Sequence, residues 1–186
     1  MQGQHNQQER ELVARIAAGD RRAFTQLVEP LVPRLLATAL RMLGARQEAE
    51  DAVQNALASA WVARGRIDPS RPFLPFLTTI TLNKCRDKLR RRKAAAFLGF
   101  GRGSMPELAS DPAPSPETET VDRQLLEQTH AEIERLPLRL REALILVAID
   151  GRSQSEAAEL LGISEKAVES LVYRARRTLR EKVAPR

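Results

Sequence analysis

Apolar residues recur at intervals of three and four along most of the chain, which is the spacing of one face of an α-helix. The first such face lies within residues 12–16 and ends at a Gly-Asp pair. A second extends over residues 24–43 and contains Pro30 and Pro33. Because proline fits the first turn of a helix but not its interior, we expect the helix to break or restart there and then to continue to Gly44.

The next helix is predicted over residues 48–65, with one apolar and one polar face. The apolar face comprises Val53, Leu57, Ala60 and Trp61, and the polar face comprises Glu48, Asp51, Gln54 and Asn55. Three prolines within residues 66–76 predict an irregular loop. A further helix is predicted from Leu77 to about residue 95; it is apolar at its start and strongly basic at its end.

Composition changes abruptly at residues 97–121. This stretch holds three glycines and four of the eleven prolines, with too little apolar periodicity to pack, which is typical of a linker. Aromatic residues make up only 4% of the chain, which favours packed helices over a β-sandwich or barrel. We therefore predict an all-α fold of two small helical domains, residues 1–96 and 122–186, joined by a flexible acidic linker at 97–121.

The last segment fits a helix-turn-helix. Ser153 and Glu156 have the spacing of a capping box, Gly162 can adopt the left-handed conformation that ends a helix, and Ser164 can cap the helix that follows. Val168, Leu171, Val172 and Ala175 are then expected to face inward. The alternative is an ordinary pair of antiparallel helices, which is disfavoured by the small residues, the glycine and the cap at these spacings and by the basic helix end that follows them.

Basic charge is concentrated at the ends of two helical segments. The net charge is +8 in residues 1–95, −4 in residues 96–122 and +2 in residues 123–186. The densest basic runs are residues 84–93 and 173–182. Each run alone is also compatible with a solvated helix face. Two runs, each closing a helical unit, favour a polyanionic partner such as DNA.

Several kinds of site are not expected. The single cysteine, Cys85, excludes an intrachain disulfide and disfavours a cysteine-based zinc site; we expect it to be buried in a helix. His5 and His130 lie far apart, so no metal or other cofactor is expected. No apolar stretch approaches the ~20 residues that span a membrane, and the polar N-terminus has no signal-peptide core. These features predict a cytoplasmic protein without membrane insertion.

Four stretches, in order, resemble the extracytoplasmic-function (ECF) branch of the sigma-70 family of RNA polymerase sigma factors. They are DRRAFTQLVEPLVPRLLATALRMLG, EAEDAVQNALASAW, PFLPFLTTITLNKCRDKLRRRK and the predicted helix-turn-helix. The resemblance covers about residues 20–96 and 122–184. It implies a first domain that binds core RNA polymerase and melts the minus-10 element of promoter DNA, and a second domain that reads the minus-35 element.

The resemblance also implies which residues make each contact. The polymerase contact falls on Glu48, Asp51, Gln54 and Asn55. The minus-10 contact falls on Asp68, Ser70, Arg71, Asn83, Lys84, Arg86, Lys88, Arg90 and Arg91. The minus-35 contact falls on Glu165, Lys166, Glu169, Ser170, Tyr173, Arg174 and Arg177. Asn55 stands where the family usually has an acidic residue, Phe76 where it has tryptophan, and Glu169 and Leu171 where many members have basic residues.

Glu169 has two possible roles. Its carboxylate can accept a hydrogen bond from the amino group of cytosine, or it can pair with Lys166, three residues earlier on the same helix face. If Glu169 reads a base, we expect an unusual minus-35 sequence with a cytosine opposite this residue.

Three functions compete. A sigma factor, with no catalysis of its own, uses every predicted feature, and the resemblance implies control by an anti-sigma factor. A stand-alone helix-turn-helix regulator on duplex DNA gives no role to residues 48–61 or 84–93. A DNA recombinase needs a serine nucleophile, and residues 1–96 offer only Ser59 and Ser70, neither convincingly placed. The sequence therefore favours the sigma factor over an enzyme.

Overall fold

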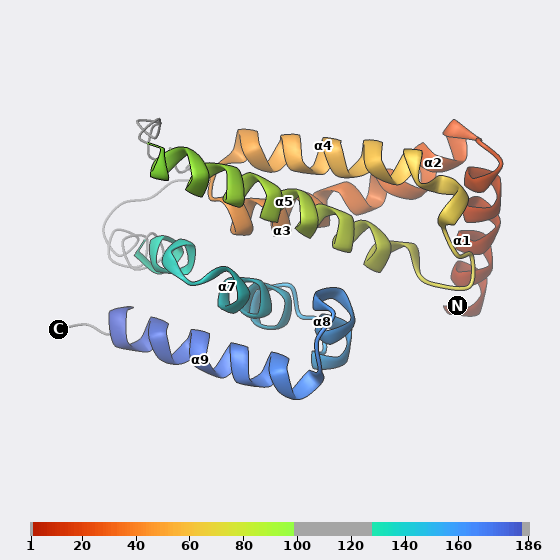
Figure 1. The fold of residues 1–186 in the computed structure, drawn as a ribbon. Coiled ribbons are helices and arrows are strands. Elements are labelled where there is room, and N and C mark those ends of the chain that lie inside the picture. Colours follow the sequence, from red (N-terminus) through yellow and green to blue (C-terminus); the bar gives the residue numbers. More distant parts are fainter. Residues whose placement is uncertain (1, 99–127, 184–186) are drawn as a thin grey trace, which may run out of the picture. The chain divides into compact units, whose positions relative to one another are not determined.

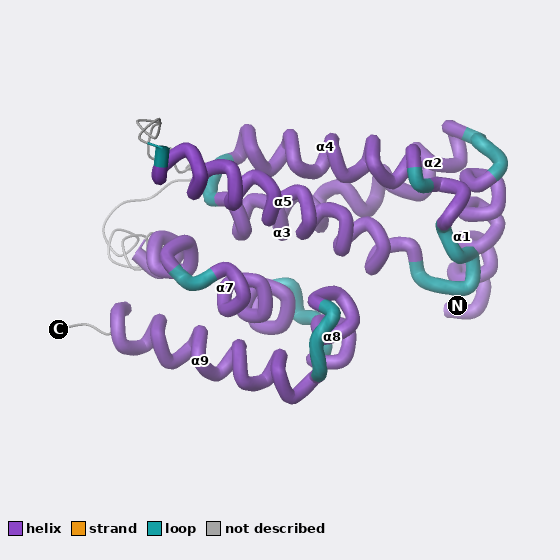
Figure 2. Tube along the Cα trace, viewed as in Figure 1, coloured by secondary structure: helices purple, strands orange, loops and turns teal. Residues whose placement is uncertain are grey.

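A computed structural model describes residues 2–98 and 128–183, and every regular element within them is helical (Figures 1 and 2). The all-α prediction is confirmed for these residues. The chain divides into two compact units, residues 1–39 with 47–103 and residues 40–46 with 104–186. Most of the predicted linker, from residue 99 to residue 121, lies outside the described residues, so the domain boundaries at 96 and 122 stay predictions.

The N-terminal helices follow the predicted order. They are α1 (Gln2–Ala17), α2 (Arg21–Val28), a 3₁₀ turn η1 (Glu29–Leu31), α3 (Val32–Leu43), α4 (Arg46–Val62), a 3₁₀ turn η2 (Arg64–Arg66) and α5 (Phe73–Phe97). The restart expected at the two prolines is confirmed, because η1 contains Pro30 and the first turn of α3 contains Pro33. Gly44, with φ of +73°, follows the end of α3.

The core of the first unit is built largely from small residues of α4. Ala49, Ala52, Ala56 and Ala60 are fully buried there. A face of alanines lets a neighbouring backbone approach closely, and α5 contributes the larger side chains Leu77 and Leu82. Cys85 is also buried in α5, as predicted. Leu57 and Trp61, predicted to be buried, are only half-buried.

Helix α5 begins earlier than the sequence predicts. Residues 73–76 were expected to be loop but form its first turn. The prediction was wrong because Pro75 occupies a position whose N–H would have no acceptor within the helix in any case. Pro72 stands at the N-cap without a capping side chain, and the carboxylate of Glu9 in α1 accepts the Phe73 N–H at 2.6 Å instead. Glu9 thereby supplies the cap that the local sequence lacks.

The second unit holds the predicted helix-turn-helix. A helical segment over residues 128–135 is followed by α7 (Leu138–Leu144), a π-helical turn η3 (Ile145–Ile149), α8 (Gln154–Leu161) and α9 (Glu165–Val183). Its core cluster comprises Ile133, Leu136, Leu140, Leu144 and Ala175, with Leu171 and Leu179 packed against it. Because this cluster joins α9 to α7, the outer face of α9 remains open to solvent.

Candidate nucleic-acid interface

The polar face of α4 is shared between solvent and helix α5. Gln54 and Asn55 are exposed, whereas Glu48 and Asp51 are half-buried. Arg92 of α5 pairs with Glu48 through two contacts, Nε to Oε1 at 3.0 Å and Nη2 to Oε2 at 2.6 Å. Lys88 Nζ lies 3.2 Å from Asp51 Oδ2. Two of the four predicted polymerase contacts therefore also fasten α4 to the basic helix.

The loop before α5 is organised around Asp68. Its Oδ1 accepts hydrogen bonds from Ser70 N–H at 2.8 Å and from Ser70 Oγ at 2.6 Å, which forms a side-chain-closed turn. These bonds, and the nearby Arg71 guanidinium with Nε 3.7 Å from Oδ2, hold the pKa of Asp68 below its ordinary value. The three loop residues predicted from the sequence are thus brought together and exposed.

The basic half of α5 carries its charges in two kinds of environment. Asn83 is exposed and accepts a hydrogen bond from Arg86 Nη1 at 2.8 Å. Arg90 pairs with Asp87 one turn earlier. Among the described residues, no carboxylate lies within ion-pair distance of Lys84 or Arg91. These two cations remain available to an external anion. Lys88 and Arg90 must first release the carboxylates with which they pair.

The helix-turn-helix is fixed by three local features: one at the start of α8, one at its end and one at the start of α9. The Glu156 N–H donates to Ser153 Oγ at 3.1 Å and the Ser153 N–H donates to Glu156 Oε2 at 2.8 Å, which confirms the capping box. Gly162 ends α8 with φ of +66° and ψ of +40°. The Ala167 N–H donates to Ser164 Oγ at 3.2 Å at the start of α9. The Ser153 N–H, and more weakly Arg152, lower the pKa of Glu156.

Helix α9 presents the predicted recognition face. Val168, Val172 and Ala175 are buried and Leu171 is half-buried, as expected for the inner face. All seven residues predicted to face outward are exposed: Glu165, Lys166, Glu169, Ser170, Tyr173, Arg174 and Arg177. Within residues 128–183, no ion pair joins Glu169 to Lys166, so the structural alternative for Glu169 gains no support.

Two residues that hold helix α5 in position could not be identified from the sequence. Glu9 caps α5 from 64 residues away, and Arg92 reaches Glu48 across 44 residues. Neither has a local spacing that would reveal its partner. In the parts of the chain that the structure describes, no group of three His, Cys, Asp or Glu side chains could hold a metal ion. None of the helices described is long and apolar enough to cross a membrane.

Comparisons with known proteins agree for both units. Residues 27–95 match the family model of sigma-70 region 2, and residues 126–179 match that of sigma-70 region 4. The RNA polymerase sigma factor NccH of Alcaligenes xylosoxydans xylosoxydans is 43% identical, with 90% of each chain covered. The sigma factor CnrH of Cupriavidus metallidurans is 39% identical, with 92% of each covered. A solved structure of CnrH in complex with the cytosolic domain of CnrY matches with a TM-score of 0.67 at 36% identity, covering 94% of this chain and 96% of that one.

Proposed function

The chain belongs to the sigma-70 family of RNA polymerase sigma factors, in its ECF branch, and we propose how its two units divide the work of promoter recognition. The first unit binds core RNA polymerase and opens the minus-10 element. The helix-turn-helix binds the minus-35 element. The observation that carries this proposal is the exposed polar and basic face of α9, which follows the capped helix α8 and its closing glycine.

The polymerase contact falls on the polar face of α4. Gln54 and Asn55 are exposed, and Glu48 and Asp51 are half-buried beside them. Asn55 offers an amide where related proteins usually offer a carboxylate, and its Nδ2 donates to the Asp51 carbonyl at 2.7 Å. Its contribution to the contact is therefore hydrogen bonding rather than charge.

The minus-10 contact combines the exposed loop before α5 with the basic half of that helix. Asp68, Ser70 and Asn83 supply hydrogen-bonding groups for the edges of unpaired bases. Arg71 and the cations of α5 then follow the phosphate backbone: Lys84, Arg86, Lys88, Arg90 and Arg91. Single-stranded DNA suits this surface because its bases are free to leave the stack.

The minus-35 contact follows the geometry of other helix-turn-helix proteins. The N-terminal half of α9 lies in the major groove, with Lys166, Glu169 and Ser170 over base edges. Tyr173, Arg174 and Arg177 lie further along the same exposed face and reach bases or phosphates. The protein contributes recognition and melting, and the polymerase contributes the chemistry, so we assign the chain no catalysis of its own.

Control by a protein inhibitor is the remaining part of the proposal. The matched CnrH structure contains the cytosolic domain of CnrY, and the chain aligns with CnrH over nearly its full length. We expect an anti-sigma factor to bind this chain in the cytoplasm and to prevent its association with core polymerase.

Holoenzyme assembly followed by run-off transcription tests the function. The purified chain should co-elute with core RNA polymerase and direct transcripts from a cognate promoter. Asp51→Arg with Gln54→Ala should abolish co-elution while circular dichroism shows unchanged helical content. Glu29→Arg with Gln26→Ala is the matched control, because these two exposed residues have the same three-residue spacing and the same change in charge. Binding of duplex DNA without any association with polymerase would instead identify a stand-alone regulator.

A further inference from the structure

A single indole ring in the first unit holds two arginines. Trp61, near the end of α4, has the guanidinium carbon of Arg64 4.8 Å from its ring centroid and that of Arg21 5.7 Å away. Arg21 begins α2, and Arg64 begins η2. Arg64 follows Trp61 by three residues, whereas Arg21 comes from a distant segment of the chain, and the two arginines meet at one ring, which we call the Trp61 site (Arg21, Trp61 and Arg64).

The site is held in place by contacts on several sides. Phe24 packs against Trp61 edge to face, with ring centroids 5.4 Å apart, and Phe24 in turn contacts the buried ring of Phe73 at 6.5 Å. Arg64 Nη1 also donates to the Trp61 carbonyl at 3.1 Å. Both guanidinium groups are thus oriented before any ligand arrives.

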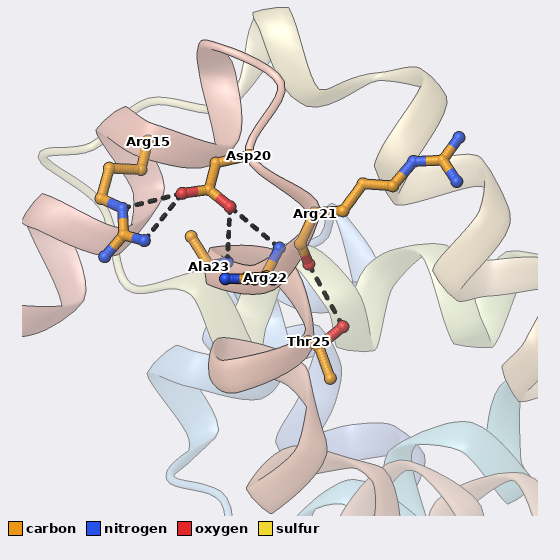
Figure 3. Close-up of polar contacts among 6 residues, drawn as sticks. All are labelled: Arg15, Asp20, Arg21, Arg22, Ala23 and Thr25. Atoms are coloured by element: carbon orange, nitrogen blue, oxygen red, sulfur yellow. Dashed lines mark hydrogen bonds and ion pairs between the residues drawn. The ribbon is translucent and has the colours of Figure 1, made fainter.

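Within residues 2–98 and 128–183, no carboxylate neutralises their positive charge. Asp20, the acidic residue next to Arg21 in the sequence, forms its hydrogen bonds with other groups, as Figure 3 shows. Its Oδ2 accepts from Arg15 at 2.7 and 3.0 Å, and its Oδ1 accepts the N–H groups of Arg22 and Ala23. These bonds lower the pKa of Asp20, chiefly through the Ala23 N–H, so the carboxylate stays ionised and bound where it is.

The side chain of Arg21 extends away from that cluster (Figure 3). Among the described residues, neither Arg21 nor Arg64 forms an ion pair with any carboxylate. By contrast, Arg15, Arg71, Arg90 and Arg92 of the same unit each pair with an acidic side chain. Two oriented, uncompensated guanidinium groups on one ring form a site for an anion with several oxygens, such as a phosphate.

We propose that the Trp61 site binds backbone phosphates of the single-stranded promoter DNA that enters the loop at residues 67–72. This inference rests on the proposed function. Turn η2 ends at Arg66, one residue before that loop, so the site lies directly upstream of it along the chain. The cations contact Trp61 and the ring is half-buried, which leaves it poorly placed to stack on a base. The ligand is therefore the backbone rather than a nucleobase, and the site adds affinity without sequence preference.

The salt dependence of DNA binding tests the assignment. Holoenzyme is assembled with wild type or Arg21→Ala/Arg64→Ala, and binding of a fork-junction promoter with a single-stranded non-template minus-10 region is measured between 50 and 200 mM salt. Each phosphate contact on a single strand contributes about 0.7 to the log–log slope. Loss of two contacts should flatten the slope by about 1.4, so the wild type loses about sevenfold more affinity than the variant over this roughly fourfold range of salt.

Arg10→Ala/Arg22→Ala is the matched control, because it removes two exposed arginines from the same unit. Its slope should equal that of the wild type, and all three proteins should bind core polymerase equally. An unchanged slope in Arg21→Ala/Arg64→Ala overturns the proposal. Weakened core binding with an unchanged slope also overturns it, since the ligand would then be an acidic surface of the polymerase. A wild-type holoenzyme that binds no promoter DNA would instead refute the proposed function itself.

Discussion

Gly162 sets the angle between the two helices of the DNA-reading unit, and replacing it with alanine should destabilise that unit by a predictable amount. The residue has φ of +66°, a conformation that costs an L-residue about 1–2 kcal/mol. An added Cβ would meet no atom within 4 Å, so no steric clash increases this cost. Alanine also restricts the unfolded chain, which offsets about 0.4–1 kcal/mol. The expected net loss is about 1 kcal/mol.

For a unit of this size, ~1 kcal/mol lowers the melting temperature by roughly 4–8 °C. Calorimetry of the full chain should show this shift in Gly162→Ala and a smaller one in Gly162→Asn, because asparagine tolerates the left-handed region. Gly65→Ala is the matched control, since Gly65 has no positive φ and equally open surroundings, and it should change stability by less than ~0.5 kcal/mol. Equal losses in Gly162→Ala and Gly162→Asn, or none in either, would refute the argument from backbone conformation.

Three further predictions concern single side chains. Asn83→Ala should reduce open-complex formation, measured by permanganate footprinting, more than closed-complex binding; equal losses would argue against a melting role. Glu169→Ala should remove a preference for cytosine worth about 1–3 kcal/mol at one minus-35 position, and an unchanged profile in a base-substitution scan would show that Glu169 reads no base. Glu156→Gln should lower the free energy of unfolding, and the size of this loss should depend on pH. Because the pKa of Glu156 is lowered in the folded protein, its ionised carboxylate stabilises the fold above the ordinary pKa of 4.5, and this contribution is lost as the pH falls through the folded-state value. Urea unfolding at pH 7 to 3 should show the difference from wild type shrinking in acid, and a pH-independent difference would contradict the capping argument.

The helix-turn-helix was predictable because its determinants are local. Ser153, Glu156, Gly162 and Ser164 each act on backbone groups within four residues, so their spacing in the sequence already specifies the geometry. The buried and exposed faces of α9 follow from helical periodicity for the same reason. The outward positions of all seven predicted residues are confirmed, while their contacts with DNA stay predictions.

The features that escaped prediction depend on partners far away in the chain. The start of α5 was placed four residues late because its cap comes from Glu9, and no local pattern announces a cap from another helix. The pairing of Asp51 with Lys88 depends on how α4 and α5 are aligned, which periodicity alone does not fix. Arg21 likewise reaches Trp61 from a different helix, and sequence spacing gives no reason to group it with Trp61 and the neighbouring Arg64.

The burial of Cys85 makes the opening rate of the first unit measurable by thiol labelling. Its thiol is the only one in the chain and is fully shielded inside α5, so a thiol-reactive dye can attach only after the surrounding helices separate. The rate of labelling therefore counts the openings of the first unit alone, without a signal from the helix-turn-helix. A partner that binds the first unit, whether polymerase or inhibitor, should lower the labelling rate of Cys85. The native thiol serves as the probe, so no engineered cysteine is needed.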